Sequence, residues 1–135
     1  MKQQHVAALT LLVLLIATGC GQKKVPLSTA STVPAASGNA VIGTDKNGNT
    51  TIDLKVHHLA KPEALTPAAA GYVVWIQPSG QPPQNAAILR VDKNLEGEFK
   101  GTTPYKNFDI FVTAENNLQA TSPSGQEIMR QHVQR

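Results

Sequence analysis

The sequence predicts an all-β fold, a small antiparallel β-sandwich of about seven short strands. Apolar and polar residues alternate in several segments between residues 40 and 133, as expected of strands with one buried face and one solvated face. Turn signals rich in Gly, Pro, Asn and Asp separate these segments. No segment carries a long apolar stripe at helical spacing, so the pattern does not favour a helical domain.

The first half of the expected domain is a hairpin followed by a central strand. Asp45–Asn49 contains Asn-Gly, a strong signal for a tight hairpin turn. The turn would join a strand at Ala40–Thr44 to one at Thr50–His58, whose alternate residues are apolar. The Ala-rich connection Leu59–Ala70 then leads to Gly71–Ile76, which is apolar on both faces, as a central strand is. The only tryptophan of the chain lies in that strand, and we expect it to fill the core under a second sheet.

The second half repeats the succession of loops and strands. Pro78–Asn85 reads as a loop, because it contains three prolines and a glycine. A turn at Lys93–Gly97 and a polar loop at Glu115–Gly125 separate the remaining strands, which we expect at Ala86–Asp92, Glu98–Lys100, Phe108–Ala114 and Gln126–Val133. Seven short antiparallel strands suit an immunoglobulin-like sandwich. A transthyretin-like strand order would give the same sequence pattern.

The N-terminal segment has the features of an export signal. Lys2 precedes an almost wholly apolar run from Val6 to Ile16, and small residues lead from the run to Cys20. A charged start, a short apolar stretch and a small-residue exit are typical of a secretory signal peptide. The run is short of the roughly 20 apolar residues that a transmembrane helix needs.

Cys20 is the only cysteine, and in an exported chain it has no disulfide partner. The segment Ala17-Thr18-Gly19-Cys20 resembles the bacterial lipobox, with Ala17 where that motif prefers leucine. The resemblance implies removal of residues 1–19 and acylation of Cys20, which would anchor the protein to a membrane of the cell envelope, facing the periplasm or the exterior. Gly21, in place of an aspartate, favours the outer membrane if the organism has one.

Residues 20–39 are expected to form the acylated cysteine and a disordered linker, and residues 40–135 the β-sandwich domain. The linker is rich in small, hydroxylated and proline residues, a composition that buries too little apolar surface to offset the entropy of ordering. Lys23 and Lys24 lie just past the anchor and could contact anionic headgroups, although paired lysines are commonly only solvated.

Composition and motifs argue against several function classes. The precursor carries a formal net charge of only +3 with interspersed signs, so no basic face indicates nucleic-acid binding. His57 and His58 are neighbours on the expected strand, where side chains point to opposite faces and cannot chelate one ion. Asp45–Asn49 faintly resembles a calcium loop, but its glycine comes too early, and a hairpin turn fits better. We expect no metal, no cofactor and no catalytic residues.

Three segments resemble a known family. Tyr72-Val73-Val74-Trp75-Ile76, then Phe108-Asp109-Ile110-Phe111-Val112-Thr113-Ala114-Glu115, then Ser122-Pro123-Ser124-Gly125 occur in the order seen in the extracytoplasmic domain of anti-sigma-K-type factors. The chain is also similar to single-domain lipoproteins built from this domain. The resemblance covers roughly Gly71 to Met129 and implies a small β-sandwich. It does not extend to sigma-factor regulation, because the cytoplasmic helix bundle and the transmembrane helix of those factors have no counterpart.

The function that the sequence favours is a lipid-anchored, non-catalytic interaction module that binds another envelope protein or a glycan. The expected binding surface combines the loop Pro78–Asn85 with Ser122–Gly125, and its candidate residues are Gln81, Gln84 and Ser124. These loops could equally serve only as solubilising turns. A small hydrolytic or metal-dependent envelope enzyme and a structural lipoprotein without a specific ligand remain alternatives.

Overall fold

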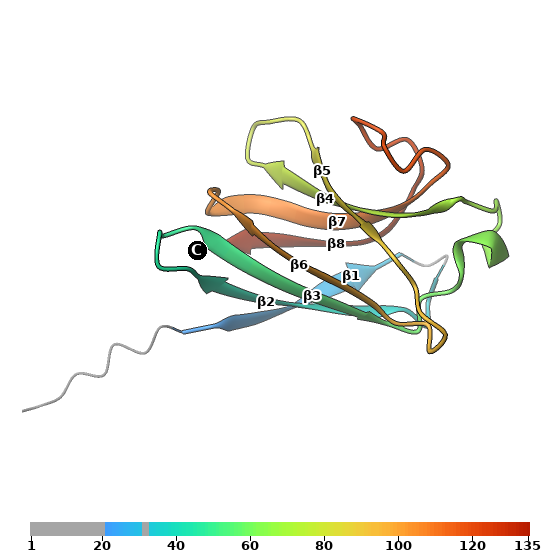
Figure 1. The fold of residues 1–135 in the computed structure, drawn as a ribbon, viewed down its shortest axis with the longest axis horizontal. Coiled ribbons are helices and arrows are strands. Elements are labelled where there is room, and N and C mark those ends of the chain that lie inside the picture. Colours follow the sequence, from blue (N-terminus) through green and yellow to red (C-terminus); the bar gives the residue numbers. More distant parts are fainter. Residues whose placement is uncertain (1–20, 31–32) are drawn as a thin grey trace, which may run out of the picture.

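Eight antiparallel strands make up the fold in the computed structural model, which describes residues 21–30 and 33–135 (Figure 1). A single 3₁₀ turn, η1 (Pro62–Ala64), precedes the fourth strand. The expected signal peptide and the expected acylation site, Cys20, lie outside the described residues. The strands in chain order are β1 (Lys23–Thr29), β2 (Ser37–Thr44), β3 (Thr50–His57), β4 (Gly71–Pro78), β5 (Gln84–Leu89), β6 (Gly97–Thr103), β7 (Asn107–Glu115) and β8 (Gln126–Gln134).

The strands form two facing layers that β1 joins. The hydrogen-bonded order is β5-β4-β7-β8-β1-β2-β3-β6, with every pair antiparallel. One layer contains β2, β3 and β6, and the other contains β5, β4, β7 and β8 (Figure 1). The chain crosses between the layers after β3, after β5 and again after β6, which is the immunoglobulin-like arrangement. The predicted fold class is confirmed, and all seven predicted strands are present.

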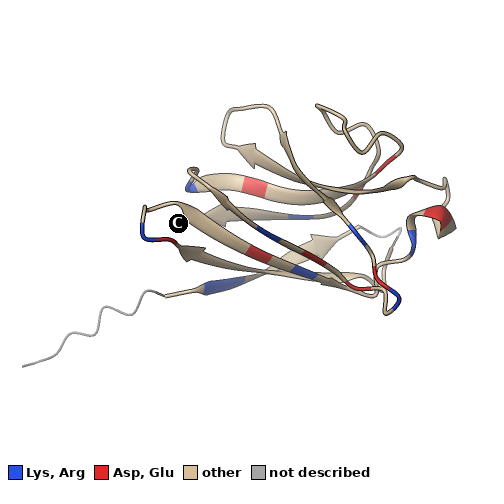
Figure 2. Ribbon diagram, in the orientation of Figure 1, with Lys and Arg blue, Asp and Glu red and all other residues tan. Residues whose placement is uncertain are grey.

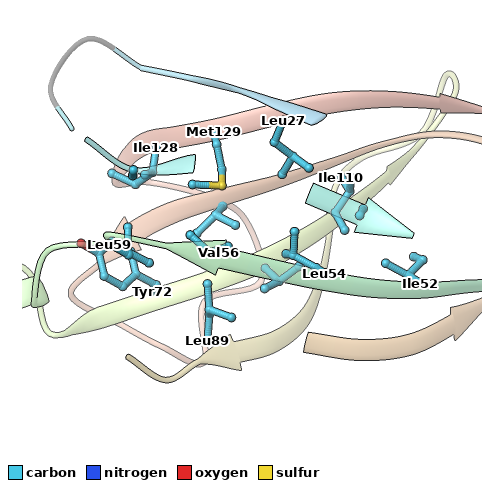
Figure 3. Packing of buried hydrophobic residues seen from close by; sticks show 14 of the residues in the cluster. Leu27, Ile52, Leu54, Val56, Leu59, Tyr72, Leu89, Ile110, Ile128 and Met129 are labelled. Atoms are coloured by element: carbon cyan, nitrogen blue, oxygen red, sulfur yellow. The ribbon is translucent and has the colours of Figure 1, made fainter. Parts of the chain in front are cut away.

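The core lies between the two layers and is filled by alternate residues of their strands. β3 contributes Ile52, Leu54 and Val56, and β4 contributes Tyr72 among others, all of them buried. Figure 3 shows these side chains converging with Leu89 and Met129 from other strands. The Tyr72 hydroxyl donates a hydrogen bond of 2.7 Å to the carbonyl of Ala60, and burial raises the pKa of this phenol to about 12. The alternation of buried and less buried residues along β3 confirms the periodicity expected for this strand.

Two turns of related sequence connect strands that are consecutive in the chain. In Asp45–Asn49 the Asp45 carboxylate accepts hydrogen bonds from the Asn47 amide and from the backbone and side chain of Asn49, and Gly48 has a φ of 82°. In Asp92–Glu96 the Asp92 carboxylate accepts two equivalent backbone bonds. Both predicted turns are therefore present, and hydrogen bonds from within its own turn occupy the Asp45 carboxylate.

The segment expected to be a linker contains the first strand of the sheet. Val25 and Leu27 of β1 are 7% and 5% exposed and belong to the main core, and β2 begins at Ser37, before the expected boundary at residue 40. The expectation of a disordered linker is therefore wrong for Lys23–Thr29 and for Ser37–Asn39. The composition of these seven residues does not predict a strand. The strand forms because it pairs with both layers and buries Val25 and Leu27 in the core between them.

Pro26 does not interrupt β1, because of where the strand has partners. Pro26 pairs with Asn39 of β2, whereas pairing with β8 is confined to Ser28 and Thr29. A proline is tolerated in a strand that has a partner on one side only, and at Pro26 the strand β1 has a partner only on the β2 side. The residue that made the segment look like a linker is thus compatible with a sheet.

Replacement of Leu27 by alanine is expected to lower the free energy of unfolding by about 2–4 kcal/mol, the usual cost of truncating a buried leucine. The neighbouring Ser28 is exposed, and Ser28→Ala should change stability by less than about 0.5 kcal/mol. Urea denaturation of the two variants and of the native chain measures both effects. Equal stability of the two variants would contradict the assignment of β1 to the folded domain.

Candidate functional site

The structure places the three residues of the expected binding surface on different elements. Gln81 is exposed in the loop 79–83, and its backbone amide donates to the carbonyl of Pro78 at 3.0 Å. The expectation that Gln84 lies in a loop is wrong, because Gln84 is the first residue of β5. Its side-chain amide lies 3.3 Å from the Tyr105 hydroxyl. Ser124 is in the loop 116–125, between β7 and β8.

Gln81 and Ser124 lie toward opposite ends of the four-stranded layer. The loop 79–83 follows Pro78, which pairs with Phe108, whereas Ser124 bonds to Glu115, which pairs with Gly71. Seven residue steps along β4 correspond to about 23 Å. The structure therefore brings Gln81 and Gln84 close to each other but does not bring Ser124 to them.

The loop 116–125 folds back over the outer face of the four-stranded layer. The side-chain amide of Asn85, on β5, donates to the carbonyls of Leu118 (3.1 Å) and Ala120 (3.0 Å). Leu118 and Ala120 pack on a second apolar cluster of Val73, Trp75 and Phe111. This loop is therefore a lid over apolar side chains, fastened at its middle to the edge strand β5.

Trp75 lies beneath this lid, and the expectation that it fills the core between the sheets is wrong. Tyr72, Val74 and Ile76 of β4 face the main core, so the alternating Val73 and Trp75 face outward. Trp75 is nonetheless fully buried, its ring stacked on Phe111 with 6.3 Å between centroids. β4 is apolar on both faces because both faces are covered. The second sheet layer covers one face, and the loop 116–125 covers the other.

A buried carboxylate holds the far end of the lid. Glu115 is 0% exposed, and its carboxylate accepts four hydrogen bonds: from the Thr113 hydroxyl (2.7 Å), from the Ser124 amide (3.1 Å) and hydroxyl (2.9 Å), and from the Gly125 amide (3.0 Å). The Trp75 indole N–H donates to Thr113 Oγ1 at 2.7 Å, which extends the network beneath the lid. Each polar atom is satisfied, as a buried charge without a cationic partner requires.

The network also controls the ionisation of Glu115. Burial alone would raise the pKa of this carboxyl, but the hydrogen bonds from Thr113, Gly125 and Ser124 outweigh it and hold the pKa below its ordinary value. Both hydrogen-bond donors of Ser124, its backbone amide and its hydroxyl, bond to Glu115. A Cβ at position 125 would lie 1.7 Å from the carbonyl oxygen of Ala114, so only glycine fits there.

A polar cluster that the sequence analysis did not identify lies on the outer face of β7 and β8. The Arg130 guanidinium donates to Asp109 (2.8 Å) and to Glu127 (2.7 Å) and stands 3.9 Å above the centre of the Phe111 ring. His132 Nδ1 lies 2.7 Å from the other Asp109 oxygen. Burial opposes ionisation of Asp109, but the bonds from His132 and Arg130 prevail and lower its pKa.

This cluster borders a shallow groove of about 540 Å³, which Ser28 and Thr29 also line. An Asp–His pair is one half of a hydrolytic site, and the other half is a nucleophile within hydrogen-bonding reach of the imidazole. The hydrogen bonds of residues 21–30 and 33–135 include none from a hydroxyl to His132. In this arrangement Asp109 and Glu127 hold Arg130 over Phe111, and His132 bonds to the second oxygen of Asp109.

Metal ligands do not gather in the part of the chain that the structure describes. It contains no group of three or more His, Cys, Asp or Glu side chains suited to hold an ion. His57 Nδ1 lies 3.0 Å from Glu96, and His58 lies beyond the end of β3 with a φ of 54°.

Comparison of the chain with protein-family models, with curated proteins and with solved structures gives no match. The resemblance to anti-sigma-K-type extracytoplasmic domains and to the lipobox therefore stays a prediction. Among the described residues, no helix has the length and apolarity to cross a bilayer.

Replacement of Glu115 by glutamine is expected to destabilise the fold by about 1–3 kcal/mol, because the amides of Ser124 and Gly125 lose an ionised acceptor. The folded-state pKa of Glu115 is depressed, so its contribution is complete above the ordinary value of 4.5 and is lost as pH falls below it. Stability measured by denaturation from pH 7 to pH 3 should therefore fall less steeply in Glu115→Gln than in the native chain.

Glu63→Gln is the matched control, because Glu63 is exposed. It should leave both stability and its pH dependence nearly unchanged. A Glu115→Gln variant with the stability and acid sensitivity of the native chain would show that the carboxylate does not fasten the lid.

Proposed function

We propose that this chain is a lipid-anchored, non-catalytic protein of the cell envelope, whose sandwich binds an extended segment of another envelope protein at the edge of β5. The anchor is Cys20, at the end of an apolar N-terminal run. The observation that carries the binding function is the open edge of β5, a strand with a partner on one side only.

The two edge strands of the described sheet differ in how they are protected. β6 presents Glu98 and Lys100, which form an ion pair of 3.0 Å, and Lys100 also lies 3.6 Å from Asp53 of β3. Charged side chains of this kind are a common defence of an edge against pairing with another chain. β5 has the sequence Gln-Asn-Ala-Ala-Ile-Leu, without a charge or a proline. Its one irregularity is a register shift opposite Val74 and Trp75, which leaves Ala86 unpaired.

The β5 edge is accessible over most of its length. β5 and β6 approach each other where Leu89 meets Gly97, at the end of one strand and the start of the other, and they diverge from there (Figure 1). At the start of β5 the Gln84 side chain reaches the hydroxyl of Tyr105, which follows β6. Gln84, Asn85 and Ala86 are exposed. An extended peptide could therefore add to β5 through backbone hydrogen bonds, the mode that open sheet edges support.

Neighbouring loops would supply the specificity of such an edge. The exposed Gln81 precedes β5 in the loop 79–83, and the lid 116–125 is bonded to Asn85, the second residue of the strand. A protein segment suits this surface better than a glycan, because Trp75 and Phe111, which could stack on a sugar ring, are buried. Gln81 and Gln84 thus remain candidate binding residues, whereas Ser124 acts through the lid.

Replacement of Ala86 by lysine is expected to abolish partner capture and to leave the melting temperature unchanged, because the new charge blocks strand addition at an exposed position. Gln81→Ala and Gln84→Ala should weaken capture, also without a loss of stability. The measurement is crosslinking in living cells with the native lipidated protein, followed by mass spectrometry of the captured proteins.

Thr102→Lys is the matched control, because it adds the same charge at an exposed position of the other edge strand, β6. Capture should survive in this variant. If Ala86→Lys retains the same dominant partner as the native chain, binding does not use the β5 edge. Cys20→Ser should remain uncut and mislocalised, and normal processing of that variant would contradict the lipid anchor.

A further inference from the structure

The loops of the sandwich form two ends that differ in charge. One end contains the start of β1, the turn 45–49, the loops 79–83 and 104–106, and Arg135. Several contacts hold these segments together: Lys23 pairs with Ile42 next to the turn, Arg135 donates to the carbonyl of Gly43 and to the Thr50 hydroxyl, and the Arg135 amide donates to the carbonyl of Lys106. We call this the hairpin end.

The hairpin end is basic and the opposite end is balanced, so the expectation that interspersed charges leave no basic face is wrong, because the fold brings distant cationic residues together. The loops of the hairpin end carry one acidic side chain, Asp45, and three exposed cationic ones, Lys46, Lys106 and Arg135. The exposed Lys23 and Lys24 of β1 adjoin these loops, and Asp53 lies across Val41 from Lys24. The loops of the opposite end carry three charges of each sign: Lys61, Arg90, Lys93, Glu63, Asp92 and Glu96. Figure 2 shows basic segments gathered where the hairpin and the C-terminus lie.

The positive charges of the hairpin end are not neutralised within the fold. None of its four lysines forms an ion pair with another residue of 21–30 or 33–135. The acidic side chain of these loops, Asp45, is occupied by its own turn, chiefly through the side chain of Asn49, and the charge of Arg135 also helps to lower its pKa. The hairpin end therefore presents free cations to whatever lies beside it.

The position of the expected anchor identifies what lies beside it. Cys20 precedes Lys23, the first residue of β1, by three residues, and three residues span at most about 10 Å. Such a short link holds the hairpin end near the lipid surface, at a distance comparable to the screening length of about 8 Å at physiological ionic strength. A long flexible linker would have kept the charges out of range.

We infer that the hairpin end binds the anionic headgroups of the membrane to which Cys20 is anchored, so that the sandwich stands on the bilayer in one orientation. This inference rests on the proposed lipid anchor. The uncharged loop 79–83 would lie at the same level as the lysines, and the β5 edge would rise from the surface, open to a neighbouring envelope protein. The anchor supplies attachment, and the lysines supply orientation.

The test uses the lipidated protein, in which acylation consumes the only native thiol. A spin label is attached at Asn47→Cys in the hairpin end, or at the exposed Ala64→Cys at the opposite end. Contact with a nickel-chelating lipid is then measured in phosphatidylcholine vesicles with and without phosphatidylglycerol. The label at position 47 should show greater contact when phosphatidylglycerol is present, and high salt should remove the increase. The label at position 64 should show no increase.

Charge reversal separates the lysines from the anchor. In Lys46→Glu/Lys106→Glu the increase at position 47 should be lost, whereas Lys61→Glu/Lys93→Glu, with the same change of net charge at the opposite end, should retain it. All four side chains are exposed, and unchanged melting temperatures confirm that the variants fold. An increase that persists in Lys46→Glu/Lys106→Glu, or its absence from the native chain, would overturn the inference.

The intact mass of the protein decides the status of the anchor independently. If the mass lacks acyl chains, the proposed anchoring fails, and the unacylated chain is sedimented with phosphatidylglycerol vesicles. Salt-sensitive binding that Lys46→Glu/Lys106→Glu abolishes would still support the basic end as a lipid-binding surface. No binding would overturn it.

Discussion

The strand β1 is the constraint on which the rest of this structure depends. It pairs with β2 through Lys23–Leu27 and with β8 through Ser28–Thr29, so seven residues join the two layers at one side of the sandwich. Val25 and Leu27 close the core there. Because β1 begins three residues after Cys20, the same strand that completes the fold fixes how far the domain stands from its proposed anchor. The stability of the fold and its distance from the proposed anchor thus depend on one element.

The outer face of the four-stranded layer is covered by a loop that polar side chains hold in place, and not by a further sheet. Trp75 and Phe111 face outward from the core and would expose a large apolar patch, of the kind that monomers avoid. The lid 116–125 covers them, and the carboxylate of Glu115 and the side chain of Asn85 hold it in place. With this face closed, the open edge of β5 remains the part of the layer where another chain can add. The covered face and the open edge together favour recognition of an extended protein segment.

Local signals in the sequence were sufficient for most of the fold and insufficient for the site. Asn47-Gly48 and the alternation in β3 are local patterns, and both predictions are confirmed. β1 was missed because its burial depends on pairing with distant strands, which a composition interrupted by Pro26 does not reveal. The cluster around Arg130 depends on the register that sets Asp109 opposite His132, and register is a property of the sheet. The prediction for Trp75 is wrong because β4 is apolar on both faces, and its sequence does not indicate which face packs against the other layer.

Amide hydrogen exchange of the protein tests the central claim most directly. The account predicts that the β1 amides that pair with β2 exchange as slowly as those of β2 itself, because one cooperative sheet contains both strands. Exchange in β1 at the rate of an unstructured peptide, with β2 protected, would contradict it. In that case residues 23–29 would be a flexible linker, and the sandwich would not be held against the membrane.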